Sequence, residues 1–417
     1  MSYSAGSWRR SLLLVAAIVA GGTAVAASSP GAVAREASPD APGQAWVGSW
    51  STTPLVGGAG FNNQTLREII HISLGGEEVR IRLTNAFGTN GVVIDDVTVG
   101  VRDAGAALVQ GTERPVTFGG AQQVTLPAGA EVLSDPVPLA VTAQQDLAVS
   151  LHVPAPTGAA TRHAGAYTTS YAASGDHAAE PSAGAFTSTL SSWYLLDGVD
   201  VLTAPETGAV VALGDSITDG TNSTVDANRR YPDDLARRLL AGPPGQLLGV
   251  LNEGASGNRL LIDGGSSGVS AQQRFDRDAL AQTGVRAVIL LEGINDIGHN
   301  LGPVSANPVT AQDLIDAMSN LIRAAHEHGL RIIGATMTPI GGSKYDTPDA
   351  EAKRQAVNEW IRAGGAFDGV VDFDRTVRDP ADPSRFLPAY DSGDHLHPND
   401  IGYQAMADAV DLNLLYR

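Results

Sequence analysis

One serine and an aspartate–histidine pair have the residue types and the spacing that nucleophilic catalysis needs. Ser216 lies in "LGDSITDG", directly after the apolar run "AVVAL". Asp394 and His397 lie three residues apart in "DSGDHLHPND", residues 391–400. A serine attacks a carbonyl carbon when a base removes its proton, and a carboxylate orients that base. A Gly-Asp-Ser turn alone is more often structural, so the case depends on the rest of the sequence.

A second histidine, His395, competes with His397 for the role of base. Pro398 and Asn399 follow His397 and are typical of a helix start, which would hold that histidine at a rigid edge. The chain need turn only once for Asp394 to reach the ring of His397. We therefore expect His397 as the base with Asp394 as its partner, and His395 as the alternative.

Two further segments carry groups that could stabilise an oxyanion. In "NEGASGN", Gly257 could present a bare backbone N–H to a ligand. In "EGIND", Asn295 offers a side-chain amide donor. A tight turn at the glycine and an Asx-turn at the asparagine are the structural alternatives. Arg259 and Glu292 flank these donors, and we expect them either to touch substrate or to form a salt bridge.

The elements that must position these residues follow Pro205, where apolar strands alternate with helical stretches. Strands are expected at 210–213, 249–252, 287–291, 331–335 and 369–373, and helices at 232–240, 271–282, 311–328, 350–363 and 399–415. This alternation predicts a parallel sheet covered on both faces, in a flavodoxin-like three-layer α/β/α fold. Active sites of such folds lie at the carboxyl ends of the strands. The candidate residues follow the first, second, third and fifth strands.

The N-terminal half has a different pattern. From Trp46 to about Leu202 the dominant period is two, as in "EVRIRL", with frequent Gly, Asn and Pro between the runs. Many short strands predict an all-β sandwich, of jelly-roll-like type. Residues 154–192 are rich in Ala, Gly, Ser and Thr, and we expect a long loop that either drapes over a neighbouring site or is mobile.

Taken together, the four segments resemble the blocks of the GDSL or SGNH esterases and lipases: "GDSITDG", "NEGASGN", "GIND" and "DHLHP". The resemblance covers residues 209–415. It implies that Ser216 is the nucleophile, His397 the base and Asp394 its partner. It also implies an oxyanion hole made by the Ser216 N–H, the Gly257 N–H and the Asn295 amide, with no cofactor and no metal. With its β-rich N-terminal half and "GNRL", the chain resembles a secreted actinobacterial group.

One residue separates the chain from the larger α/β-hydrolase class. The nucleophile elbow of those enzymes is G-x-S-x-G, and Thr218 stands at the position of the second glycine. The acidic residues near Ser216 could also bind calcium, but their spacing lacks a calcium-loop pattern and predicts a solvated surface instead. These residues are Asp215, Asp219, Asp226 and Asp233.

The N-terminus predicts an exported protein. Arg9 and Arg10 precede an apolar run and then small residues, which is typical of a signal peptide at residues 1–26. Twin-arginine export is an alternative to the general route. We expect a flexible leader at 27–44, a β-sandwich accessory domain at 45–202 and a hydrolase domain at 203–417.

The amino-acid composition of the chain limits the kinds of molecule that it could bind. The 417 residues carry a formal net charge of −18, which argues against nucleic acid, and the chain has no cysteine, which excludes disulfides and a thiol nucleophile. We expect no stable membrane insertion, and a monomer that acts on a small-molecule or polysaccharide ester. Short acyl groups of acetyl type on carbohydrate are the first expectation. A lipase or lysophospholipase, a feruloyl-type esterase, and a glycan-binding protein with a silent hydrolase domain are the alternatives.

Overall fold

The computed structural model describes residues 43–243, 246–298 and 309–416. These residues belong to one compact unit. The expected signal peptide and nearly all of the expected leader lie outside the described residues. Within the described ranges, no helix combines the length and the apolar character that crossing a bilayer would require.

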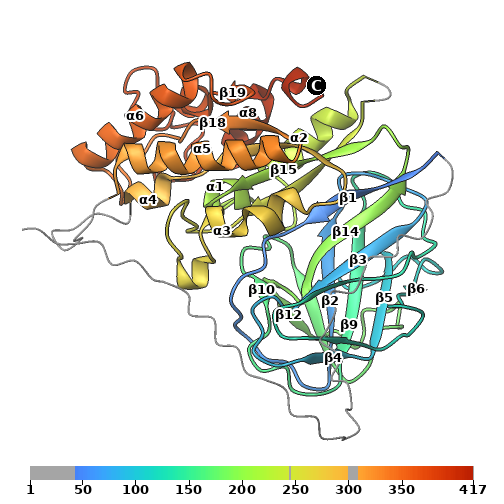
Figure 1. The fold of residues 1–417 in the computed structure, drawn as a ribbon. Helices are drawn as coiled ribbons and strands as arrows, with labels where there is room; N and C mark the ends of the chain where they lie inside the picture. The colour runs from blue at the N-terminus through green and yellow to red at the C-terminus, as the bar shows by residue number, and fades with distance from the viewer. Residues whose placement is uncertain (1–42, 244–245, 299–308, 417) are drawn as a thin grey trace, which may run out of the picture. The chain divides into compact units, whose positions relative to one another are not determined.

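The C-terminal half is built on a five-stranded parallel sheet (Figure 1). Its strands are β15 (Gly208–Gly214), β16 (Leu248–Gly254), β17 (Val285–Leu291), β18 (Arg331–Ala335) and β19 (Gly369–Val371). Their order in space is β16-β15-β17-β18-β19, which is the flavodoxin-like order. Every residue of β15 is buried, as expected for a strand covered on both faces. The predicted fold class of this half is confirmed.

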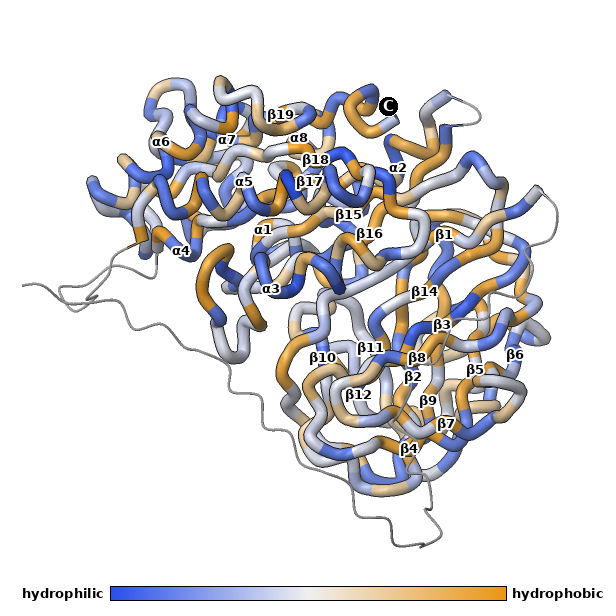
Figure 2. Tube along the Cα trace, in the orientation of Figure 1, coloured by the Kyte–Doolittle hydropathy of each residue, from blue (hydrophilic) through white to orange (hydrophobic). Residues whose placement is uncertain are grey.

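Helices cover this sheet in two groups. α2 (Tyr231–Leu240) packs on α8 (Asp400–Ala409), whereas α5 (Ala311–Glu327) packs on α6 (Pro348–Ala363) and on α3 (Ala271–Phe275). Figure 2 shows hydrophobic and hydrophilic residues alternating along α5 and α6, as amphipathic helices require. Three short helices follow strands: α1 (Ser216–Asp219), α4 (Ile294–Gly298) and α7 (Phe373–Val377).

Two helix predictions were wrong in their extent. The helix expected at 271–282 consists of α3 and a π-helical turn, η2 (Asp276–Leu280). The last helix was expected to reach residue 415 but ends at Ala409, because Val410 is extended. The Asp411 side chain then accepts a hydrogen bond from Asn413 N and caps a separate 3-10 turn, η3 (Leu412–Leu414). A local bond of this kind competes with continuation of a helix.

The N-terminal half consists of antiparallel sheets, as predicted. One has the order β1-β14-β3-β8 and another β12-β11-β2-β9-β5-β6, with two-stranded pairs β10-β13 and β4-β7. The bounds are β1 (Ala45–Ser51), β2 (Gln64–His71), β3 (Val79–Thr84), β4 (Val92–Ile94), β5 (Asp96–Val101), β6 (Arg114–Pro115), β7 (Val124–Leu126), β8 (Glu131–Leu133), β9 (Asp146–Val153), β10 (Arg162–His163), β11 (Ser170–Ser174), β12 (Ser188–Leu190), β13 (Trp193–Tyr194) and β14 (Leu196–Thr203).

The expected structureless loop at 154–192 contains three of these strands, β10, β11 and β12. β11 pairs with β2, and the Ser170 hydroxyl also accepts a hydrogen bond from Ile69 N. Small residues make this segment look like a loop in the sequence, but three short stretches of it pair with other strands of the β-rich half. The segment is therefore part of the β-rich half.

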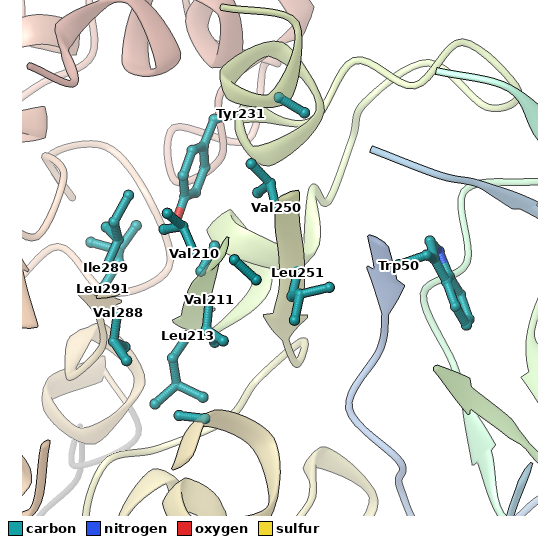
Figure 3. Packing of buried hydrophobic residues seen from close by; sticks show 14 of the residues in the cluster. Trp50, Val210, Val211, Leu213, Tyr231, Val250, Leu251, Val288, Ile289 and Leu291 are labelled. Atoms are coloured by element: carbon teal, nitrogen blue, oxygen red, sulfur yellow. The ribbon is translucent and has the colours of Figure 1, made fainter. Parts of the chain in front are cut away.

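The two halves pack directly on each other through β1 and β16. A Cβ on Gly48 would lie 2.8 Å from Leu251 Cδ1, and Gly48 N donates to Thr283 O at 2.9 Å. Figure 3 shows the strand that carries Val250 and Leu251 between the apolar residues of β15 and β17 on one side and the strand of Trp50 on the other, with the Trp50 side chain pointing away from it. Buried residues of both halves form one continuous hydrophobic cluster, so the sheet that carries the candidate site is braced from the N-terminal side.

Candidate active site

Ser216 is the first residue of α1 and directly follows the end of β15. The Asp215 side chain caps this helix by accepting a hydrogen bond from Ile217 N at 2.9 Å. Ser216 is 7% exposed. In the part of the chain that the structure describes, its backbone N–H has no hydrogen-bond partner. The serine therefore places a hydroxyl and a free N–H at a helix N-terminus, where negative charge is favoured.

His397 joins Ser216 to Asp394. Its Nε2 lies 2.8 Å from Ser216 Oγ, and its Nδ1 lies 2.6 Å from Asp394 Oδ2. Because Nδ1 faces a carboxylate, that nitrogen carries the proton of the neutral ring. Nε2 is then free to accept the proton of the serine hydroxyl, which is the arrangement that a general base needs.

Asp394 is held as a carboxylate by several donors. Oδ1 accepts from the backbone N–H groups of Leu396 and His397, each at 2.9 Å, and Oδ2 accepts from Asn222 Nδ2 at 3.0 Å. Burial alone would raise the pKa of Asp394, but the hydrogen bonds from the His397 ring and from the two backbone groups outweigh it. They lower the pKa to about 2. Asp394 is therefore ionised throughout the neutral range.

The alternative base, His395, lies elsewhere. Its Nδ1 contacts Asp391, its side chain is 47% exposed, and its φ is +61°. With this backbone conformation, the side chain of His395 points in a different direction from the side chain of His397. The structure brings His397 to Ser216 and pairs His395 with a different aspartate.

Gly257 lies in the loop that follows β16, and Asn295 lies in α4, which follows β17. Gly257 has φ +78°, a conformation that strains any other residue, and a Cβ there would lie 2.6 Å from Ser267 Oγ, which would have to move. Asn295 Nδ2 donates to Asn258 O at 2.9 Å, and Tyr345 OH donates to Asn295 Oδ1 at 2.9 Å. These two bonds fix which way the amide faces and leave one amide N–H available.

Like the N–H of Ser216, the Gly257 N–H has no partner within the described ranges. Asn295 is linked to the Gly257 loop through Asn258, the next residue along the chain. Two unpaired backbone N–H groups and one oriented amide are the kind of donors that stabilise a tetrahedral oxyanion. The five predicted residues come from four separate segments of the chain. Hydrogen bonds join Ser216, His397 and Asp394 to one another, and Asn295 to the loop that contains Gly257.

A buried arginine that the sequence reasoning missed lies beneath these loops. Arg274 donates to Asn258 Oδ1 at 2.9 Å, to Gly214 O at 2.8 Å and to Thr53 Oγ1 at 3.1 Å. It also pairs with Asp278 and, at 3.4 Å, with Glu292. Arg274 thus connects the ends of β15 and β16 with the N-terminal half.

The two residues expected to flank the oxyanion donors have separate roles. Glu292 forms its salt bridge with Arg274, not with Arg259. Burial, and then the nearby Asp215, raise the pKa of Glu292 well above its usual range, while Arg274 opposes that rise. Arg259 Nη2 donates to Asp263 O at 2.8 Å on the surface.

The expectation of a solvated acidic surface near Ser216 was wrong for two of its four residues. Asp215 is 1% and Asp219 2% exposed. The four carboxylates have separate partners: Ile217 N for Asp215, His163 and Ser256 for Asp219, Thr169 for Asp226, and Arg230 N for Asp233. These side chains are part of the loop structure.

Replacing Arg274 with methionine is expected to destabilise the fold by about 3 to 5 kcal/mol, because it leaves buried carboxylates without their cation. Urea denaturation followed by circular dichroism measures this change in the free energy of unfolding. The matched control is Arg323→Met, which removes an arginine whose side chain is 64% exposed and pairs with Glu327 on α5. That control is expected to cost less than about 1 kcal/mol. Equal effects of the two substitutions would contradict the role given to Arg274.

Other missed residues left no pattern in the sequence. Asn222, Tyr345 and His163 contact site residues across long stretches of chain, and each is an isolated polar residue in a loop or at a short strand. A single feature pointed toward one of them: His163 lies in a small-residue segment with several aromatic residues.

Comparison with known families matches residues 212–405, just under half of the chain, to the GDSL-like Lipase/Acylhydrolase family. No curated protein matches the chain. A GDSL-like lipase of Bacteroides thetaiotaomicron is 19% identical, with 49% of this chain and 87% of that one covered and a TM-score of 0.35. An acetylxylan esterase of Geobacillus stearothermophilus is 22% identical, with 50% and 94% covered and a TM-score of 0.38. These structural likenesses are too weak to assign a substrate.

The family match includes Ser216, Gly257, Asn295, Asp394 and His397, and the strand order of the sheet beneath them is the one expected for such domains. Residues 212–405 are a domain of the GDSL-like lipase/acylhydrolase family.

Proposed function

We propose that this protein is a serine esterase that hydrolyses carboxylic esters through an acyl-enzyme intermediate. The observation that carries the proposal is the line of hydrogen bonds from Ser216 Oγ to His397 Nε2 at 2.8 Å and from His397 Nδ1 to Asp394 Oδ2 at 2.6 Å. A serine, an imidazole and a carboxylate in this order form the proton path of acyl transfer.

In the first half of the reaction, His397 Nε2 accepts the proton of Ser216 as Oγ bonds to the ester carbonyl carbon. The carbonyl oxygen becomes an oxyanion and receives hydrogen bonds from the backbone N–H groups of Ser216 and Gly257 and from the Asn295 amide. The tetrahedral intermediate then expels the alcohol, which takes the proton from His397. In the second half, water attacks the acyl-enzyme by the same path and releases the acid.

As substrates, we propose esters of short acyl groups, of acetyl type, on carbohydrate. The loops beside the catalytic residues are polar and solvent-exposed, since Asn222, Gly393 and His395 are all exposed. A long acyl chain would need apolar contacts along its length to gain from binding. The polar alcohol part of a sugar ester suits such a rim.

We also propose that the protein acts outside the cell. The support is the residue pattern of the first 26 positions, with Arg9 and Arg10 before an apolar run and small residues after it. N-terminal sequencing of the protein from the culture medium would give a mature chain that starts near residue 27.

Labelling with a fluorophosphonate probe tests the esterase function. The probe is expected to attach to Ser216 of the native protein, identified by peptide mass spectrometry, and to leave the Ser216→Ala variant unlabelled. Absence of labelling on the native protein would overturn the proposal.

A series of p-nitrophenyl esters then tests the substrate class, and kcat/KM is expected to be highest for acetate and butyrate. A kcat/KM that rises toward long acyl chains would instead support a lipase.

A further inference from the structure

A buried histidine of the β-rich half contacts the helix that carries Ser216. His163 Nδ1 lies 2.9 Å from the carbonyl oxygen of Thr53, and its Nε2 lies 3.1 Å from Asp219 Oδ1. The side chains of His163 and Asp219 are each 2% exposed. Asp219 is the last residue of α1 and Ser216 the first. The contact therefore reaches the nucleophile's own helical turn from the other half of the chain.

Asp219 in turn holds the loop that precedes Gly257. Its Oδ2 accepts hydrogen bonds from Ser256 N at 3.0 Å and from Ser256 Oγ at 2.6 Å. Since the Ser256 hydroxyl donates to Asp219, its oxygen accepts from Thr221 Oγ1 at 3.0 Å. One carboxylate thus ties α1, which presents the Ser216 N–H, to the residue next to the Gly257 N–H.

The segment around His163 fits Asp219 closely. A Cβ on Gly165 would lie 2.7 Å from Asp219 Oδ2, so a side chain there would displace the carboxylate. The ring of His163 also packs near Trp193, with the ring centroids 5.7 Å apart. The Gly165 backbone therefore lies against the Asp219 carboxylate, and the Trp193 ring lies beside the imidazole of His163.

The hydrogen bonds also determine the charge of the pair. Nδ1 of His163 faces a carbonyl oxygen and must carry a proton, and a further proton lies between Nε2 and Asp219 Oδ1. The pair is neutral overall whichever of the two atoms holds that proton. Without the histidine, Asp219 would be a buried and unpaired negative charge, which is costly in itself. It would also lie one helical turn from the position where an oxyanion develops.

We propose that His163 is a positioning residue for the hydrolysis. It neutralises and orients Asp219, and Asp219 keeps the Gly257 loop at the right distance from α1. The inference rests on the proposed function, because it concerns the donors that the oxyanion would use. In this account the β-rich half contributes to the geometry of the oxyanion hole.

The test is the variant His163→Gln in the full chain. Glutamine retains a hydrogen-bond donor but cannot supply the second proton, so Asp219 stays charged and its loop shifts. We expect kcat for p-nitrophenyl acetate to fall by about 10- to 100-fold with KM nearly unchanged, because a misplaced donor weakens the transition state more than the ground state. The affinity for an alkyl boronic acid, which forms a tetrahedral adduct with serine, should fall by the same factor.

Two further variants separate positioning from general stability. His152 is a matched control, because it also lies in the β-rich half, pairs with Asp95 at 2.6 Å, and is 7% exposed. His152→Gln should leave kcat within about twofold of the wild type. The double variant His163→Gln/Asp219→Asn restores a neutral pair, and the side-chain amide oxygen introduced at position 219 can still accept from Ser256. It should recover most of the lost kcat.

The results for these three variants either support or overturn the role given to His163. The inference is overturned if folded His163→Gln keeps kcat and boronic acid affinity within about twofold of the wild type, or if His152→Gln loses as much. It is also overturned if the double variant is no better than the single one. A wild-type protein that neither reacts with the fluorophosphonate nor hydrolyses any ester would overturn the proposed function, and the inference with it.

Discussion

Ser216→Ala is expected to lower kcat for p-nitrophenyl acetate by about 10⁶-fold, the loss found when a serine protease lacks its nucleophile. The substitution removes a single oxygen atom, the one that lies 2.8 Å from His397 Nε2. The backbone N–H of residue 216 stays in place, as do Gly257 and Asn295. The variant should therefore still bind an ester and polarise its carbonyl group.

The fold of this variant should be intact. Ser216 is the first residue of α1, where alanine has good helix propensity, and the helix cap is supplied by Asp215. Steady-state hydrolysis measures kcat, and thermal unfolding checks the fold. Ser319→Ala is a suitable control, because it removes a helical serine on α5 whose hydroxyl donates to Ile315 O of the same helix. A Ser216→Ala enzyme with about a hundredth of the wild-type kcat or more would show that another group is the nucleophile.

The sheet of this domain could be predicted because its strands are buried on both faces. An uninterrupted apolar run such as "AVVAL" fits a strand that is buried on both faces and few other positions in a folded chain. Each such run is followed by a helical stretch. The positions of the candidate site residues follow from the same pattern, because the carboxyl ends of parallel strands meet at one edge. Asp394 and His397 add a pairing that depends only on local spacing.

The supporting contacts could not be predicted in this way. Arg274 reaches Thr53, which is 221 residues away, and His163 reaches Asp219 from another half of the chain. Such contacts between single polar side chains have no periodicity in the sequence, because burial of one polar group depends on partners that only the fold brings near. The same holds for the strands within 154–192, where small residues carry no alternating pattern.

The sequence pattern also did not predict where the helices end. The stretch at 271–282 has helical periodicity throughout, yet its second half is a π-helical turn. Such a turn inserts one residue into the helical repeat and often lies near functional residues. Here it follows Arg274 and carries Asp278, which pairs with that arginine.

Asp394→Asn is expected to lower kcat by about 10⁴-fold, because it forces the wrong tautomer on His397, the proposed base. The atom at Oδ1 accepts from the backbone N–H groups of Leu396 and His397 and must remain an oxygen. The amide nitrogen would then occupy the position of Oδ2 and donate to His397 Nδ1. With Nδ1 as an acceptor, the proton moves to Nε2, which can no longer take the proton of Ser216.

A repulsive contact makes this loss larger. Asn222 Nδ2 donates to Asp394 Oδ2 at 3.0 Å, so two NH₂ groups would face each other in the variant. Asn222→Asp combined with Asp394→Asn would relieve the contact and is expected to leave the tautomer wrong, so it should not restore kcat.

The pKa of Asp394 near 2 means that its carboxylate stays charged until the pH falls to that value. The acid limb of the wild-type rate is therefore not expected to arise from protonation of Asp394 near neutral pH.

The control is the same substitution on the neighbouring pair. Asp391→Asn removes the carboxylate that contacts His395, in the same loop and by the same change. If His397 is the base, Asp391→Asn should reduce kcat by no more than about threefold, while Asp394→Asn loses about 10⁴-fold. The reverse ranking would make His395 the base and would require the loop to rearrange before catalysis. Because both aspartates also accept backbone N–H groups of this loop, a change in loop stability should affect both variants, and the difference in kcat between them isolates the role of the histidine tautomer.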